Sequence, residues 1–271
     1  MDPLRFENMI TYDYEINNEK ISKNVLIQPM VKSFYLHTHI TKDILEGLNK
    51  YLDNLYNDEK SESYSAKLVG QIKSGKQLNI NKEDPLIKPL IDEVMNFAKL
   101  YVNIFEKING TGSVHPQMID NYSDFNYIRE NHDSKFKLKK ELKMDDVWSV
   151  HQKKYDYNPL HYHTNDKSLF GLSWFLHVNL PDKLDESNFE GLNGKNSDGF
   201  YDGTTNFIWD TNRPFDSENF VFSGTSKLIR EAGHIYIFPQ WLQHHVYPFD
   251  CEGERRTISG NIACIYNEVK G

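Results

Sequence analysis

The stretch GHIYIFPQWLQHHVYP, residues 233–248, decides the fold that we predict for this chain. A glycine precedes a run of β-branched and aromatic residues, which favours a strand. The strand should end near Pro239, because proline has no backbone N–H to donate within a sheet. A tryptophan and a leucine then lead into His244 and His245. We therefore expect a short strand, a turn and a histidine pair, in this order.

Four other segments show the same short β-branched and aromatic runs, divided by Gly, Pro, Asn and Asp. They are VWSVHQK (147–153), SLFGLSWFLHVNL (168–180), TNFIWD (205–210) and RRTISGNIACIY (255–266). Long helical stripes are absent from this part of the sequence. Several short strands of this kind predict a sandwich or a double-sheet barrel.

The N-terminal part of the chain has helical periodicity instead. Apolar residues recur at helical spacing over 42–56 and over 86–108, and the second stripe stops at Asn109-Gly110. The charged run KFKLKKELK (135–143) indicates a solvated face. The glycine-rich segment 187–206 indicates a long loop, which is a reasonable lid.

These patterns predict one domain over 1–271, mainly β with flanking helices (α+β). A helix-containing support region over 1–146 would precede a catalytic-type double-sheet core over 147–267. We find no internal repeat and no strong linker that would divide the chain further.

Composition excludes several classes of protein. The 271 residues include 31 basic and 39 acidic side chains, a net charge of −8, which argues against a general nucleic-acid binder because phosphate contacts need a basic face. The two cysteines, Cys251 and Cys264, cannot form a disulfide framework, so we expect a reducing compartment, the cytoplasm. We find neither a signal peptide nor a membrane-spanning apolar run. Oligomeric state cannot be read from the sequence.

Three histidines stand out by their context. His161 and His163 lie in NPLHYHTND, and two residues apart on a strand they project to the same face. On a helix the same spacing would separate them by roughly 200°. Together with His244 on a neighbouring strand, the pair would make a metal site with open coordination positions.

A polar stripe follows in the segment ERRTISGN. On a strand, Arg255, Thr257, Ser259 and Asn261 share one face, and the opposite face is mostly apolar after Arg256. A polar stripe inside a barrel needs a polar occupant, because unpaired buried polar groups are costly. An arginine with a hydroxyl two residues later suits a carboxylate.

The order of these motifs resembles the Fe(II)/2-oxoglutarate-dependent oxygenases, and within them a phage and bacterial group. That group has the patterns H-x-H, F-P-x-W-L-x-H-x-V and R-x-S-x-S-F-N. The segment TNFIWDTNRP is similar to its F-x-D-P-R motif, with Phe207 and Asp210 in place. Residues 68–75 show a weaker similarity to the same group. The resemblance covers 148–265, and the residues that carry it are His161, His163, Phe238, Pro239, Trp241, Leu242, His244, Val246, Pro248, Arg255, Thr257, Ser259 and Asn261.

The resemblance implies a cupin-like jelly roll called the double-stranded β-helix. It implies Fe(II) held by the three histidines, and 2-oxoglutarate bound through Arg255 and Thr257, with Asn261 in the same site. The reaction would hydroxylate a small molecule or a protein or peptide side chain, and would release succinate and CO2. Tyr157 and Trp174 are candidates for the cosubstrate pocket and equally for the core.

The chain departs from the family in two places. Most of these oxygenases have H-x-D or H-x-E, and here His163 occupies the position of the carboxylate. Asp166 is the alternative second ligand, but it is five residues past His161 and too far for a same-face strand pair. Gly260 replaces the usual phenylalanine, which we attribute to packing.

Other candidates are weaker. Arg256 is the alternative to Arg255, and His245 to His244, but each would point to the opposite strand face. Trp241 is predicted to pack and to set the turn before His244. His151 is a weaker candidate for the barrel mouth. The remaining histidines are interpreted as surface, packing or structural residues, and they include His37, His39, His177 and His234.

Two other functions remain open. One is a three-histidine cupin-type dioxygenase that does not use 2-oxoglutarate. The other is a non-enzymatic barrel module, for instance in a phage particle.

Overall fold

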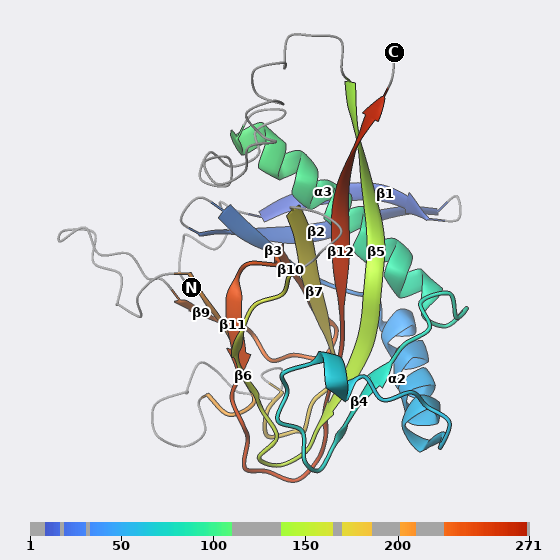
Figure 1. The fold of residues 1–271 in the computed structure, drawn as a ribbon, viewed down its shortest axis with the longest axis vertical. Coiled ribbons are helices and arrows are strands. Elements are labelled where there is room, and N and C mark those ends of the chain that lie inside the picture. The colour runs from blue at the N-terminus through green and yellow to red at the C-terminus, as the bar shows by residue number, and fades with distance from the viewer. Residues whose placement is uncertain are drawn as a thin grey trace, which may run out of the picture.

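The computed structural model describes residues 9–16, 19–30, 33–109, 137–164, 170–185, 201–209 and 225–269. These residues form two antiparallel sheets and two α-helices (Figure 1). The helices are α2 (Lys42–Asn57) and α3 (Lys88–Asn109), and a short 3-10 helix covers Ser65–Lys67. The strands are β1 (Met9–Ile16), β2 (Glu19–Met30), β3 (Ser33–His39), β4 (Lys76–Asn79), β5 (Lys137–Gln152), β6 (Asn158–His161), β7 (Phe170–Asn179), β8 (Thr205–Ile208), β9 (Thr225–Lys227), β10 (His234–Pro239), β11 (Gln243–Val246) and β12 (Arg255–Val269).

The larger sheet has the strand order β1-β2-β3-β10-β7-β12-β5-β4, and the smaller sheet has the order β6-β11-β8-β9. Strands from distant parts of the sequence are therefore neighbours, as β12 is between β7 and β5. Figure 1 shows β7, β12 and β5 side by side through the centre of the molecule.

The two faces of the larger sheet bury different side chains. On β10, Ile235 and Ile237 belong to the core that the sheet shares with α2 and α3, and Tyr236 and Phe238 belong to a second core. This alternation follows from the period of two along a strand. The second core also contains Phe207 of β8, so it lies between the two sheets.

Two antiparallel sheets that face each other, with helices covering the outside of the larger one, form a double-stranded β-helix. The predicted fold class, mainly β with flanking helices, is therefore confirmed. The helices predicted over 42–56 and 86–108 are α2 and α3, with ends that differ by one or two residues.

The sequence interpretation missed four N-terminal strands, β1 to β4. Of these, β3 pairs with β10 and β4 pairs with β5, so the N-terminal part of the chain extends the larger sheet on both sides. The division into a support region over 1–146 and a core over 147–267 stays a prediction. The charged run 135–143 lies mostly in β5, where Glu141 and Lys143 are exposed.

Most of the predicted lid, 187–206, lies outside the described residues, and its last two residues already belong to β8. None of the described helices combines the length and the apolar character that crossing a bilayer requires.

Gly260 explains one departure from the family pattern. It pairs with Trp174 across β12 and β7, and a Cβ atom on Gly260 would lie 2.7 Å from Trp174 Nε1 and 2.8 Å from the Asp146 carbonyl oxygen. The indole of Trp174 therefore occupies the space that a side chain at position 260 would need.

We expect Gly260→Ala to lower the free energy of unfolding by about 1–3 kcal/mol, the usual cost of overpacking. Gly47 in α2 is the matched control, because nothing lies within 4 Å of its added Cβ. Gly47→Ala should raise the free energy of unfolding by about 0.5–1 kcal/mol through helix propensity. Urea denaturation measures both, and an unchanged stability of Gly260→Ala would contradict the packing argument.

Candidate functional site

Pairing between β6 and β11 brings the predicted histidines together. His161 lies directly opposite His244 in the register of the two strands. His163 follows β6, and its backbone N–H donates to the Gln240 carbonyl oxygen at 2.8 Å, which holds it beside the turn before β11. One ring nitrogen from each histidine lies within 4.8 Å of the other two. The structure therefore places His161, His163 and His244 in one cluster, as the sequence predicted.

Hydrogen bonds orient all three rings in the same sense. Nδ1 of His161 lies 2.7 Å from the Pro159 carbonyl oxygen, and Nδ1 of His244 lies 3.0 Å from the Leu242 carbonyl oxygen. Nδ1 of His163 lies 2.8 Å from Asn261 Oδ1. Because these oxygens accept, each Nδ1 carries the proton and each Nε2 keeps a lone pair for a metal.

Burial keeps the three imidazoles neutral. It lowers the pKa of His163 to about 4, against the opposing effect of the Asn261 hydrogen bond. It also lowers the pKa of His161, and it lowers that of His244 well below the ordinary value, with the two neighbouring histidines acting in the same direction. Neutral imidazole is the form that binds metal, so the cluster fits a divalent cation such as Fe(II).

A cavity of about 280 Å³ lies beside the histidines, and the polar stripe of β12 lines it. Arg255, Thr257, Ser259 and Asn261 all contribute to its wall, as strand parity predicts. Leu68 and Val69 line it as well, and they belong to the segment 68–75, which has the weaker similarity to the family.

Arg255 is a buried cation at the wall of this cavity. Its side chain is only 2 % exposed, Nη1 donates to Gln152 Oε1 at 2.6 Å, and Nη2 donates to Thr205 Oγ1 at 3.0 Å. Its Nε has no hydrogen-bond partner, and no carboxylate of the described residues forms an ion pair with it. Burial, together with Arg230, lowers the pKa of Arg255 to about 9. A buried arginine without an anion is costly, so its surroundings fit a bound carboxylate.

His177 adds a second unpaired group in the same interior. It is fully buried on β7 opposite Thr257, and neither of its ring nitrogens has a hydrogen-bond partner. Buried polar atoms are nearly always paired, so the unpaired Nε of Arg255 at the cavity wall indicates a polar occupant there. His177 itself does not line that cavity. The prediction of a structural or surface role for His177 did not anticipate this position.

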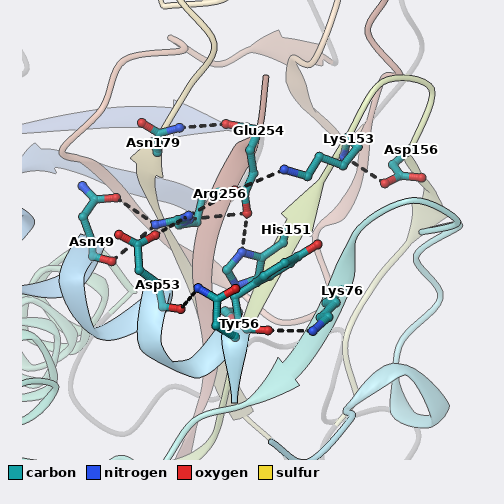
Figure 2. A network of polar contacts seen from close by, with 12 residues as sticks. Asn49, Asp53, Tyr56, Lys76, His151, Lys153, Asp156, Asn179, Glu254 and Arg256 are labelled. Atoms are coloured by element: carbon teal, nitrogen blue, oxygen red, sulfur yellow. Dashed lines mark hydrogen bonds and ion pairs between the residues drawn. The ribbon is translucent and has the colours of Figure 1, made fainter. Parts of the chain in front are cut away.

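Arg256 does not line the cavity, and Figure 2 shows its side chain beside Asp53 and Glu254. It pairs with Asp53 of α2 at 2.9 Å and with Glu254 at 3.0 Å. His151, the weaker candidate for the barrel mouth, does not line the cavity either, and its Nδ1 contacts Glu254. The arginine and the histidine therefore form an ion-pair network with α2 and take no part in the cavity.

Several other candidates fall outside the site. The His245 ring packs against Tyr247, with ring centroids 4.5 Å apart, and does not join the cluster. Tyr157 is 39 % exposed and does not line the cavity. Trp174 is part of the core and also borders the cavity. Trp241 is 40 % exposed and lies in the turn between β10 and β11, so its packing role stays a prediction. Asp166 and Asp210 lie outside the described residues.

Three contributors were missed from the sequence. Gln152 and Thr205 bind the Arg255 guanidinium, and Ser173 Oγ donates to Asn261 Oδ1 at 2.8 Å. Gln152 lies directly opposite Arg255 in the register of β5 and β12. Strand parity within each segment is consistent with these positions, but only the pairing between segments identifies them.

The segment that contains the site is similar to a known protein family. Residues 146–261 match a family model described as "Putative 2OG-Fe(II) oxygenase". This range includes both histidine segments and the arginine stripe. No curated protein sequence matches the chain.

Solved structures that match at low sequence identity include two prolyl hydroxylases and HygX. A prolyl-4-hydroxylase from Pseudomonas putida is 11 % identical, with a TM-score of 0.44, over 84 % of this chain and 91 % of that chain. A viral collagen prolyl hydroxylase from Paramecium Bursaria Chlorella virus-1, in a 2-oxoglutarate complex, is 13 % identical, with a TM-score of 0.43, over 84 % and 96 %. HygX from Streptomyces hygroscopicus, with nickel, 2-oxoglutarate and hygromycin B bound, is 10 % identical, with a TM-score of 0.42, over 84 % and 82 %.

The family match and the site geometry concern the same residues. The segment that carries His161, His244 and Arg255 is therefore the part of this chain that is similar to the 2OG-Fe(II) oxygenase family.

Proposed function

We propose that this protein is an Fe(II)- and 2-oxoglutarate-dependent dioxygenase. It hydroxylates a small molecule or a protein or peptide side chain and releases succinate and CO2. His161, His163 and His244 hold the iron, and Arg255 with Thr257 holds the far carboxylate of 2-oxoglutarate. When bound, the iron and the cosubstrate supply oxygen activation coupled to decarboxylation.

The observation that carries this proposal is the buried Arg255 beside the histidine cluster. Both groups border one cavity, and the arginine lacks a carboxylate partner within the described residues. A dicarboxylate cosubstrate would provide one carboxylate for the arginine and one for the metal. This match favours 2-oxoglutarate over a metal-bound substrate without a second acidic group.

The chain's own residues position these groups. Gln152 and Thr205 accept hydrogen bonds from two guanidinium nitrogens of Arg255. The guanidinium group is therefore oriented before a ligand binds. Asn261 lies in the predicted cosubstrate stripe, and its contact with His163 Nδ1 adds a second role, that of orienting a metal ligand. Tyr162 lines the cavity and is 56 % exposed, which suits contact with the substrate.

The location of the protein follows from its thiols. Neither Cys251 nor Cys264 forms a disulfide, which fits a reducing compartment, and we propose the cytoplasm.

A three-histidine dioxygenase that does not use 2-oxoglutarate is the second candidate, because His163 replaces the usual carboxylate. Its activity would persist without 2-oxoglutarate and would tolerate loss of Arg255. No observation favours the third possibility, a barrel module of a phage particle.

The direct test is anaerobic addition of Fe(II) and 2-oxoglutarate to the purified protein. We expect the visible charge-transfer absorption of the iron–2-oxoglutarate chelate. Absence of this absorption at saturating concentrations of both would reject the proposal.

His161→Ala and His244→Ala should abolish the chelate absorption, because each removes an imidazole ligand. His245→Ala is the matched control, since its ring packs against Tyr247 and does not join the cluster. The absorption should persist in this control. Unchanged absorption in both ligand variants would show that iron binds elsewhere.

Arg255→Ala should weaken 2-oxoglutarate binding by about 2–5 kcal/mol, the cost of removing one partner of a buried charge pair. Arg256→Ala should leave that affinity nearly unchanged, because Arg256 faces Asp53 and Glu254. Anaerobic calorimetric titration of the Fe(II)-loaded variants measures both. Equal losses, or a larger loss for Arg256→Ala, would exclude the assigned roles.

His163→Asp should retain iron and some 2-oxoglutarate turnover, because it restores the commoner ligand set of two histidines and a carboxylate. Asp166→Ala should leave the metal in place. The measurements are iron content and succinate release. An empty site in Asp166→Ala and a filled one in His163→Ala would reverse the ligand assignment.

A further inference from the structure

A second histidine cluster lies where β3 pairs with β10. His39 is directly opposite His234 in the register of these strands, and Glu231 precedes β10 by three residues. Both histidines border a separate cavity of about 530 Å³, and none of the three residues lines the cavity of Arg255. We propose that His39, Glu231 and His234 form a second metal site, one that binds Zn(II).

The distances within the cluster suit a tetrahedral ion. Glu231 Oε1 lies 3.6 Å from His39 Nε2, and Glu231 Oε2 lies 3.1 Å from His234 Nε2. One ligand atom from each residue lies within 4.8 Å of the others. Bonds of about 2.0–2.1 Å in tetrahedral geometry place ligand atoms about 3.3 Å apart, so small rotations of these side chains complete the site.

His37 supplies the outer hydrogen bond that such a site needs. Its Nε2 contacts His234 Nδ1, and its ring stacks on Tyr236 with centroids 4.5 Å apart. When His234 Nε2 binds a metal, its Nδ1–H donates to His37 Nε2. Metal-bound histidines almost always donate their second ring N–H in this way.

The backbone before β10 holds Glu231 and His234 in position. Gly233 has φ +90°, its N–H donates to the His177 carbonyl oxygen at 2.7 Å, and its carbonyl oxygen accepts from Ile40 N at 3.0 Å. A Cβ at Gly233 would lie 3.0 Å from His39 Nδ1. The turn therefore requires glycine both for its conformation and for the approach of the ligand.

The local charges are compatible with a cation. Glu231 carries one negative charge, and at His39 burial and Lys23 lower the pKa while Asp185 acts in the opposite direction with a smaller effect. Lys23 donates to the His39 carbonyl oxygen at 2.9 Å, but its ammonium also pairs with Glu93 at 3.2 Å, which offsets its charge.

The ligand set indicates both the metal and its open position. Two imidazoles and one carboxylate suit Zn(II) better than Mg(II) or Ca(II), which prefer oxygen ligands alone. The His39 side chain is 48 % exposed, so the fourth position is accessible to water. Three protein ligands with one open position are typical of zinc sites that bind water or a substrate group.

The test is calorimetric titration of Zn(II) into the chelator-treated full-length protein and its variants. His39→Ala and Glu231→Gln should each reduce the Zn(II) stoichiometry by one equivalent per chain. Both side chains are partly exposed, so neither change removes a core contact. Glu46→Gln on α2 is the matched control for a lost carboxylate, because Glu46 is 69 % exposed and pairs with Lys42, and it should change nothing. His37→Asn should keep the stoichiometry and weaken Zn(II) by about 10–100-fold.

A variant that lacks two of the proposed iron ligands distinguishes this site from the proposed iron site. The double variant His161→Ala/His244→Ala should still bind one Zn(II), and adding His39→Ala should remove it. The proposal fails if the double variant binds no Zn(II), or if its Zn(II) binding is indifferent to His39→Ala and Glu231→Gln. Failure of iron or 2-oxoglutarate binding in the unmodified protein leaves these results unaffected, so the two proposals are tested independently.

Discussion

The alternation of side chains along β12 is the constraint on which both the core and the site depend. Ile258 and Ile262 face the helices, and Arg255 and Thr257 face the cavity between the sheets. A shift of one residue would exchange these faces, placing charge in the apolar core. Because β12 is paired on both sides, with β5 and β7, its register is set twice. Burial of the apolar side chains on one face of β12 therefore fixes the position of the polar side chains on its other face.

The same strand links the two halves of the proposed catalytic site. Arg255 lies at one end of the stripe, and Asn261 at the other end contacts the metal-ligand candidate His163. Ser173 of β7 donates to the same Asn261 oxygen, so the orientation of His163 depends on the pairing of β7 with β12. A change that loosens this pairing would disturb metal and carboxylate binding together, even without touching either ligand.

Strand parity within single segments was enough to predict much of this site. It separated Arg255 from Arg256 and placed Thr257 and Asn261 at the cavity. It could not identify Gln152 or Thr205, since their contact with Arg255 depends on which strands become neighbours. Two of the four missed N-terminal strands, β3 and β4, illustrate a related reason. They pair with the distant strands β10 and β5, and that information is not local in sequence.

The two His-x-His pairs show the same limit most clearly. In both, the spacing places the two rings on one side of the chain, and nothing local distinguishes them. What differs is the partner that pairing supplies. For β6 it is β11, which brings His244 opposite His161, and for β3 it is β10, which brings His234 opposite His39. The first cluster lies between the sheets, and its Nδ1 atoms are hydrogen-bonded. The second lies where the partly exposed carboxylate of Glu231 can reach it. Chain topology, acting through strand register, thus determines which chemistry an identical spacing can support.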